Sequence, residues 1–137
     1  MSEVILQPFE SFGKLRFGMT RADVRAVLSE EPKEFRKGLS PNVTDAYDSA
    51  GVHAHYDADG LLEFIDSFPP CRPAFAGVEL LRPDYRAVIG ELERLGLTVR
   101  DDGDGGLWFD DAGFVLYAPA GRIEGVSVFR RGYDTGA

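Results

Sequence analysis

The sequence predicts an α+β fold of two tandem repeats lying side by side, each a helix followed by an antiparallel sheet. Three observations support this prediction: a partial internal repeat, two segments of helical periodicity, and short apolar runs separated by turn residues. The chain has 137 residues, of which 44% are apolar, which is enough for one compact core. We therefore expect residues 1–69 and 70–137 to form two halves of a single globular unit.

The internal repeat is found by shifting the chain against itself by 61 positions. Residues 21–28 then align with residues 82–89, with five identities in eight positions. The same shift aligns four further identical pairs: Tyr56 with Tyr117, Gly60 with Gly121, Glu63 with Glu124, and Phe68 with Phe129. A slip of one residue adds YDSAG at 47–51 and FDDAG at 109–113. These matches indicate a duplication of one structural unit.

Each repeat begins with a predicted helix, and the first is preceded by an extra strand over residues 4–9, VILQPF. Thr20 is a good N-cap for the first helix, and Asp23, three residues later, completes a variant capping box. Apolar residues follow at helical spacing. In the second helix we expect Pro83 at the first helical position and a stop at Gly96.

After each helix the pattern changes to short strand-like runs. They are expected near residues 43–48, 52–56 and 61–68 in the first repeat, and near 97–100, 107–109, 114–117 and 123–129 in the second. Turn residues at 57–60 and 118–121 predict equivalent hairpins. Between the repeats, FPPCRPAF at 68–75 contains three prolines, which exclude a central strand and suit a stiff connector.

The net charge of the chain limits the kinds of molecule that it is expected to bind. Acidic residues outnumber basic ones by 23 to 15, so the formal charge of -8 disfavours nucleic acid and anionic membranes and favours a basic protein. The first residues lack the basic and apolar regions of a signal peptide, and no window is apolar enough to span a membrane, so we expect a cytoplasmic location. Cys71, the single cysteine, cannot form an intramolecular disulfide.

The two histidines raise the question of a metal site. His53 and His55 are two residues apart on an expected strand, so they share a face with Asp57 and offer three ligands in a row. In the second repeat the aligned positions are Phe114 and Leu116. We therefore favour ordinary half-buried sheet surface over a metal site, with Asp57 serving the turn, and we predict no metal or cofactor.

Other polar motifs give no catalytic constellation. The segment 101–106, DDGDGG, resembles the start of a calcium loop, but no glutamate follows at the twelfth loop position, so we expect a hairpin loop. The serines lack a nucleophile motif and the glycines form no phosphate loop. Glu63 and Glu124 are equivalent, either as a carboxylate pair or as solvent-facing strand residues. We assign no catalytic residue, and the sequence favours a protein that is not an enzyme.

Residues 15–28, LRFGMTRADVRAVL, resemble a signature of β-lactamase-inhibitor-protein-like domains, in which G-M-T precedes a helix with spaced V and L. The small lipoprotein of the outer-membrane barrel-assembly machinery shares this signature. The β-lactamase inhibitor protein is similar in having two repeats of a helical segment and a four-stranded antiparallel sheet. The resemblance implies that an open sheet face, rich in aromatic and polar groups, binds a protein. It does not imply β-lactamase inhibition, because fold does not fix function.

We therefore expect a non-catalytic protein-binding module, of the kind that serves as the inhibitor or immunity partner of a toxin or enzyme. Its binding residues would be aromatic and acidic side chains on adjacent strands: Tyr47, Tyr56, Trp108, Phe109, Tyr117, Asp48, Asp110 and Asp111. This hypothesis requires that several of the aromatic residues be exposed together. The competing interpretation places them in the core between sheet and helices.

Two other hypotheses stay open from the sequence. A small-molecule-binding protein or small enzyme would use a pocket between the repeats, with His53, His55, Glu63 and Glu124 as its polar groups. A self-associating structural domain would instead present a large apolar homodimer face. The sequence fixes neither the oligomeric state nor the identity of a partner.

Overall fold

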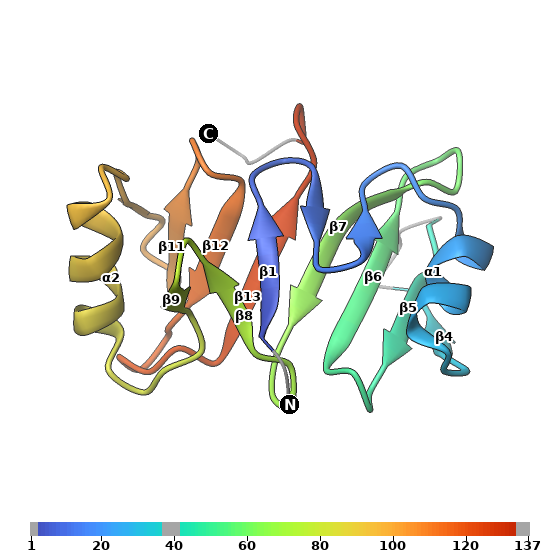
Figure 1. The fold of residues 1–137 in the computed structure, drawn as a ribbon, viewed down its shortest axis with the longest axis horizontal. Coiled ribbons are helices and arrows are strands. Elements are labelled where there is room, and N and C mark those ends of the chain that lie inside the picture. The colour runs from blue at the N-terminus through green and yellow to red at the C-terminus, as the bar shows by residue number, and fades with distance from the viewer. Residues whose placement is uncertain (1–2, 37–41, 134–137) are drawn as a thin grey trace.

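The computed structural model describes residues 3–36 and 42–133, and this part of the chain forms two helices and two sheets in an α+β arrangement (Figure 1). In chain order the elements are β1 (Val4–Gln7), β2 (Ser11–Phe12), β3 (Leu15–Arg16), α1 (Arg21–Leu28), β4 (Lys33–Phe35), β5 (Thr44–Tyr47), β6 (Val52–Tyr56), β7 (Leu62–Ser67), β8 (Pro73–Phe75), β9 (Val78–Glu79), α2 (Tyr85–Arg94), β10 (Arg100–Asp101), β11 (Gly106–Phe109), β12 (Phe114–Tyr117) and β13 (Gly125–Phe129). The larger sheet has the order β10-β11-β12-β13-β7-β6-β5-β4 and is antiparallel throughout. The smaller has the order β3-β2-β1-β8-β9, with β1 and β8 parallel.

The two faces of the eight-stranded sheet have different surroundings. The small sheet covers the middle of one face, flanked by α1 towards the β4 end and α2 towards the β11 end (Figure 1). Side chains alternate along each strand, and in β6 the residues Val52, Ala54 and Tyr56 are buried on this covered face. His53 and His55 point to the opposite face and are half-buried. We call that opposite side the open face.

The core lies between the eight-stranded sheet and the layer that covers it. It includes fully buried side chains from both halves of the chain: Val24, Tyr47, Leu62, Ile65, Val88, Leu92, Phe109, Phe114 and Leu116. The halves meet where β7 pairs with β13 in the middle of the sheet. Residues 1–69 and 70–137 thus share one sheet and one core, while the duplication inferred from the sequence stays a prediction.

Capping residues fix the limits of both helices. The Thr20 hydroxyl accepts the backbone N–H of Asp23 at 3.2 Å, and the carboxylate of Asp23 accepts that of Thr20 at 3.3 Å, which confirms the predicted capping box. In α2 the N-cap is Asp84, so Pro83 precedes the cap instead of opening the helix, which corrects the prediction. Gly96 follows the last turn with a φ of 92°, a conformation that suits glycine and ends the helix as expected.

An ion pair with a buried carboxylate joins α1 to the sheet. Arg21, the first residue of α1, donates from Nε and Nη2 to the two carboxylate oxygens of Asp45 on β5, both at 2.9 Å. The Asp45 side chain is only 1% exposed. Near it, the hydroxyls of Tyr47 and Tyr56 are buried and have no hydrogen-bond partner among the described residues. Burial raises the pKa of both phenols.

The structure confirms the predicted strands of the large sheet, with shifts at several ends, the largest at β10, which begins at Arg100 instead of residue 97. Five further strands, β2, β3, β4, β8 and β9, were not predicted, because strands of two or three residues are too short to show alternation. The proline-rich segment is also corrected, since it contains β8. Pro73 is the first residue of that strand, a position where proline is tolerated.

The sequence aligns Tyr56 with Tyr117, but these two residues lie on opposite faces of the large sheet, although alternation is regular along both strands. Tyr56 is 3% exposed in the core, whereas Tyr117 is 48% exposed on the open face. A slip of one residue along a strand moves a side chain to the other face, so the comparison of repeats by a constant shift fails here. Phe114 and Leu116, aligned with the two histidines, are buried on the covered face and are therefore not their structural equivalents, while His53 and His55 are half-buried as expected.

Candidate functional site

The predicted aromatic binding residues divide between the two faces of the large sheet. Tyr47, Tyr56 and Phe109 are 0%, 3% and 1% exposed, because they point towards the helices and the small sheet. They are core residues, so the prediction that these three bind a partner was wrong. Trp108 and Tyr117 lie on the open face. Of these two, Tyr117 is exposed and Trp108 is half-buried, so the expectation that several of the five are exposed together is wrong, and only these two remain as candidates.

The three acidic residues of the same prediction lie in turns at the ends of strands. Asp48 follows β5, with Oδ2 3.4 Å from Nζ of Lys33. Asp110 follows β11 and accepts two hydrogen bonds from Arg100, at 2.8 and 3.1 Å. Asp111 is exposed in the same turn as Asp110. Asp48 and Asp110 therefore already have basic partners within the chain.

A concavity of about 530 Å³ lies on the open face and spans strands of both halves. Its lining contains four aromatic and four carboxylate side chains: Phe64, Phe68, Trp108, Tyr117, Asp66, Asp102, Asp104 and Glu124. Of the residues that the structure describes, no lysine or arginine lines it. The open-face concavity therefore combines aromatic surface with excess negative charge.

Aromatic side chains cover one end of the open face. The ring of Phe129 lies 6.1 Å from that of Phe9 and 5.8 Å from that of Tyr133, measured between centroids. Tyr133 also lies 5.0 Å from Phe64. Phe129 is consequently 1% exposed, although it belongs to the open face. Phe64 belongs both to this cluster and to the lining of the open-face concavity, so the two regions adjoin.

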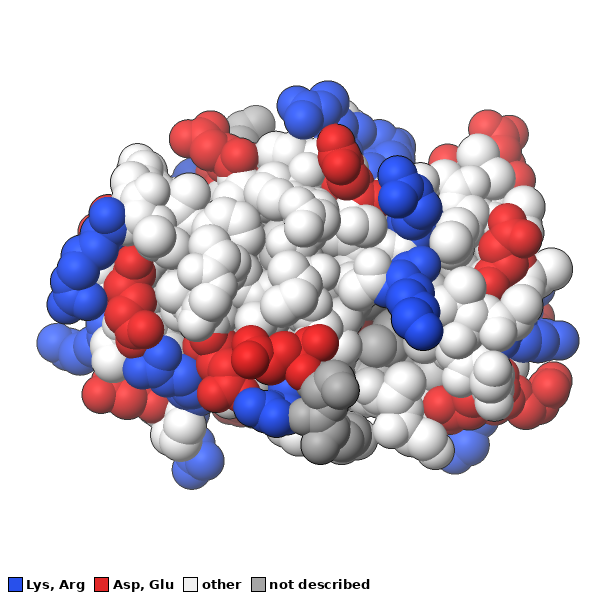
Figure 2. Space-filling model, in the orientation of Figure 1, with Lys and Arg blue, Asp and Glu red and all other residues white. Residues whose placement is uncertain are grey.

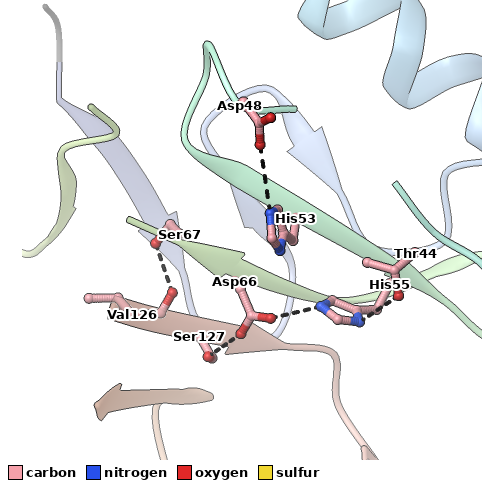
Figure 3. Close-up of polar contacts among 8 residues, drawn as sticks. All are labelled: Thr44, Asp48, His53, His55, Asp66, Ser67, Val126 and Ser127. Atoms are coloured by element: carbon pink, nitrogen blue, oxygen red, sulfur yellow. Dashed lines mark hydrogen bonds and ion pairs between the residues drawn. The ribbon is translucent and has the colours of Figure 1, made fainter. Parts of the chain in front are cut away.

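A chain of polar contacts crosses four strands of the open face (Figure 3). Nε2 of His55 lies 2.8 Å from Oδ2 of Asp66, whose Oδ1 accepts a hydrogen bond from the Ser127 hydroxyl at 2.6 Å. Nδ1 of His55 lies 3.2 Å from Oγ1 of Thr44. The chain links β5, β6, β7 and β13, so it ties the two halves together where they meet.

The order of groups in this chain differs from that of a catalytic triad. In a triad the imidazole lies between the hydroxyl and the carboxylate and removes the hydroxyl proton. Here the carboxylate of Asp66 lies between Ser127 and His55, and both ring nitrogens of His55 are engaged (Figure 3). The arrangement orients side chains across the sheet and leaves Ser127 without a histidine base.

The second histidine is held between aromatic rings. His53 packs edge-on against Phe35 at 5.5 Å and Phe68 at 4.7 Å, with Nε2 3.9 Å from a carboxylate oxygen of Asp48. Within residues 3–36 and 42–133, no three histidine, cysteine, aspartate or glutamate side chains are placed to hold a metal ion. Asp57 instead accepts two backbone N–H groups of its own turn, at 2.9 and 3.0 Å.

The structure separates the four residues of the alternative pocket. His53 and Glu124 line the open-face concavity. His55 and Glu63 line a different, smaller hollow of about 130 Å³. Oε1 of Glu63 is 3.2 Å from an Nη2 of Arg130, so this carboxylate already has a basic neighbour. The four residues therefore do not form one acid–base site.

The segment 101–106 forms the predicted hairpin loop between β10 and β11. Oδ1 of Asp102 accepts the backbone N–H groups of Asp104 and Gly106 at 2.8 and 2.9 Å, and Oδ2 accepts the indole N–H of Trp108 at 2.9 Å. The hydrogen bond from Trp108, together with the backbone bonds, lowers the pKa of Asp102. Asp102 therefore fixes both the loop and the position of Trp108 on the open face.

Several residues of the site escaped the sequence analysis. Asp66 and Ser127 are 61 positions apart in sequence and meet only through the pairing of β7 with β13. Asp102 and Asp104 were identified only as turn residues. The available signal was the alternation in β7, which places Asp66 on the same face as the histidines.

Comparisons with protein-family models, with curated proteins and with solved structures found no match to this chain. In the described part of the chain, no helix is long and apolar enough to cross a membrane.

Proposed function

We propose that this chain is a non-catalytic protein-binding module whose open face binds a protein with a basic surface. The observation that carries the proposal is the lining of the open-face concavity, where carboxylates and aromatic rings occur without a described lysine or arginine. Electrostatic complementarity of this kind sets the choice of partner and accelerates association. Aromatic side chains in a concave site supply the apolar contact area.

The charge distribution favours a different protein over a second copy of the chain. A symmetric dimer through the open face would bring Asp102, Asp104 and Glu124 towards the same carboxylates of its partner. Like charges facing one another cost free energy. On the side of the small sheet, basic and acidic side chains are instead interspersed around an uncharged surface over β1, β8 and β9 (Figure 2).

We further propose that the module acts in the cytoplasm as the inhibitor or immunity-type partner of a toxin or enzyme. Cys71 is buried without a disulfide, and burial raises its pKa to about 11, so its thiol stays protonated and inert. A lone reduced thiol is typical of the cytoplasm. The resemblance of residues 15–28 to domains that bind proteins through an open sheet face agrees with this role.

The test begins with proteins captured from a lysate of the cell that makes the chain, followed by affinity measurements between the purified partner and variants. The double variant Asp104→Lys/Glu124→Lys reverses two charges in the open-face concavity. Glu10→Lys/Glu93→Lys makes the same change in net charge at exposed positions outside it.

We expect the concavity variant to weaken binding by at least about tenfold and the control to remain within about twofold of wild type. Equal weakening by the two variants would indicate unspecific attraction between net charges and would refute a site on the open face. Retention of a small molecule in place of a protein would favour the pocket hypothesis, since the volume suits such a ligand.

A further inference from the structure

Tyr117 differs from the other aromatic side chains of the open face in its cross-strand neighbours, which are both glycines. Its cross-strand partners are Gly106 on β11 and Gly125 on β13. Cross-strand neighbours in an antiparallel sheet usually place their Cβ atoms about 4.5–5.5 Å apart, where they pack against each other. Because neither neighbour has a Cβ, no side chain from these two positions covers the Tyr117 ring, and Tyr117 is 48% exposed.

Backbone conformation does not require glycine at either flanking position, because neither residue has a positive φ. A Cβ at Gly106 would collide with Asp102 and Trp108, so glycine there makes room for their hydrogen bond. A Cβ at Gly125 would meet only the carbonyl oxygen of Ser67, at an ordinary 3.4 Å. Since glycine weakens a strand, its occurrence at 125 fits a position where a ligand approaches the sheet closely.

The neighbouring aromatic residue shows what such a surface binds. The guanidinium carbon of Arg100 lies 4.9 Å from the centroid of the Trp108 ring, and Asp110 accepts two hydrogen bonds from the same guanidinium. Here an aromatic face and a carboxylate together hold an arginine of the chain itself. This combination is favourable because the planar guanidinium stacks on the ring and donates hydrogen bonds to the carboxylate in its own plane.

The same combination is present at Tyr117 without an arginine. Asp104 and Glu124 line the open-face concavity with Tyr117, and neither forms an ion pair with any residue in the described ranges. Both carboxylates are exposed, as is the tyrosine ring. The site thus lacks only the cation that Trp108 already has.

We propose that Tyr117, Glu124 and Asp104 form a subsite for an arginine side chain of the protein partner. The guanidinium stacks on the Tyr117 ring and donates hydrogen bonds to the carboxylates, while the aliphatic stem occupies the space above Gly125. Arginine suits this site better than lysine, since the ammonium group is more strongly hydrated and does not stack as a plane. The proposal rests on the proposed function, because it names the chemical group by which the open face recognises its partner.

The test uses three short peptides, acetyl-Ala-Xaa-Ala-amide, in which Xaa is arginine, lysine or neutral citrulline. Each is titrated into the nitrogen-15-labelled chain while amide chemical shifts are followed. We expect the arginine peptide to shift the amides of Gly106, Tyr117 and Gly125, with weaker binding for lysine and none for citrulline. Gly125→Val, which fills the space, and Glu124→Gln should each weaken the arginine peptide by about three- to tenfold, while Glu93→Gln leaves it unchanged.

Equal binding of the lysine and arginine peptides would overturn the preference for arginine. Unchanged affinity in Gly125→Val, or shifts confined to another surface, would overturn the subsite. A second variant, Tyr117→Leu, tests whether the ring binds the arginine peptide or only stabilises the sheet by covering the two glycines. We expect Tyr117→Leu to stay folded and lose peptide binding; lowered stability with unchanged binding would refute recognition.

The outcome also separates this inference from the function on which it rests. If charge reversal at Asp104 and Glu124 abolishes binding of the protein partner but no arginine peptide binds, the arginine subsite fails and the binding module stands. If the protein partner binds the charge-reversed variant normally, the proposed function fails first.

Discussion

The two halves of the large sheet hold their helices in different ways. In the first half Arg21 of α1 forms a bidentate ion pair with buried Asp45 of β5. Among the described residues α2 has no such pair with the sheet, and it buries Val88 and Leu92 as α1 buries Val24. Stability in the first half therefore depends on a polar pair in addition to apolar packing, whereas the second helix is held by apolar packing alone among these contacts.

The open faces of the two halves differ as well. Across the first half and the junction, His55 and Asp66 are engaged by other side chains of the chain. In the second half, Tyr117 and Glu124 face the open-face concavity without such partners among the described residues. Polar groups that satisfy one another serve the fold, while groups left unsatisfied at an accessible surface are available to a partner. This difference directs the functional hypothesis to the second half.

The largest effect is expected from breaking the ion pair of the first half. Arg21→Ala leaves the charge of buried Asp45 without its partner and should lower the free energy of unfolding by about 2–4 kcal/mol, less than for a fully buried pair because Arg21 is 36% exposed. In Arg82→Ala, which removes a more exposed pair with Glu91, the loss should stay below about 1 kcal/mol. Urea unfolding of both variants measures the difference, and equal losses would contradict the contrast between halves.

A smaller effect is expected where the halves meet. Ser127→Ala removes a hydrogen bond to the carboxylate of Asp66 and should lower the free energy of unfolding by about 1 kcal/mol. The exposed Ser49 is the matched control, and Ser49→Ala should change stability by less than about 0.5 kcal/mol. Urea unfolding again provides the measurement. No difference between the two variants would show that the polar chain adds nothing to the junction.

The buried tyrosines of the first half should be visible in an alkaline titration. Burial raises the pKa of Tyr47 and Tyr56 above the ordinary 10.0, so the folded state favours the protonated phenols. Their contribution to stability is therefore present below that pH and is lost as the pH rises further. Absorbance near 295 nm should show these two of the five tyrosines ionising only together with unfolding. Reversible ionisation of all five in the folded state would contradict their burial.

The smallest effect concerns the loop of the second half. The lowered pKa of Asp102 means that its hydrogen bonds are fully present above about pH 4 and are lost as the pH falls through its folded-state value. We expect the emission of Trp108, the single tryptophan, to change in this acid range while far-ultraviolet circular dichroism still reports a folded chain. Asp102→Asn should remove the change and Asp104→Asn should retain it. The same acid change in both variants would assign it to another group.

The two helices and the main strands could be predicted from the sequence because their periodicity extends over several residues. The short strands β2, β3 and β9 were not predicted, because two residues each are too few to show an alternation. The prediction that Tyr47 and Tyr56 of the first half face outward was also wrong, since both are buried. In β6 the regular alternation of Val52, Ala54 and Tyr56 with the two histidines places Tyr56 on the covered face, whereas the alignment of Tyr56 with Tyr117 suggested the open face.

The candidate site was predicted only in part, for related reasons. Trp108 and Tyr117 were identified because aromatic residues in strands are common binding residues, but periodicity alone did not separate them from the buried Phe109. Gly125 was not predicted as a site residue, since a glycine in a strand has no side chain whose chemistry could indicate a function. Its importance follows from its pairing with Tyr117, which only the sheet register shows.

The most direct test of the central claim is site-specific photo-cross-linking at three exposed apolar residues. Ile5 on β1, Leu95 at the end of α2 and Tyr117 on the open face are 43%, 50% and 48% exposed. Each is replaced in turn by p-benzoylphenylalanine, and the chain is irradiated with its captured partner. We predict a cross-linked product from position 117 and none from positions 5 or 95. A product from position 5 alone would place the partner on the small sheet and contradict the account.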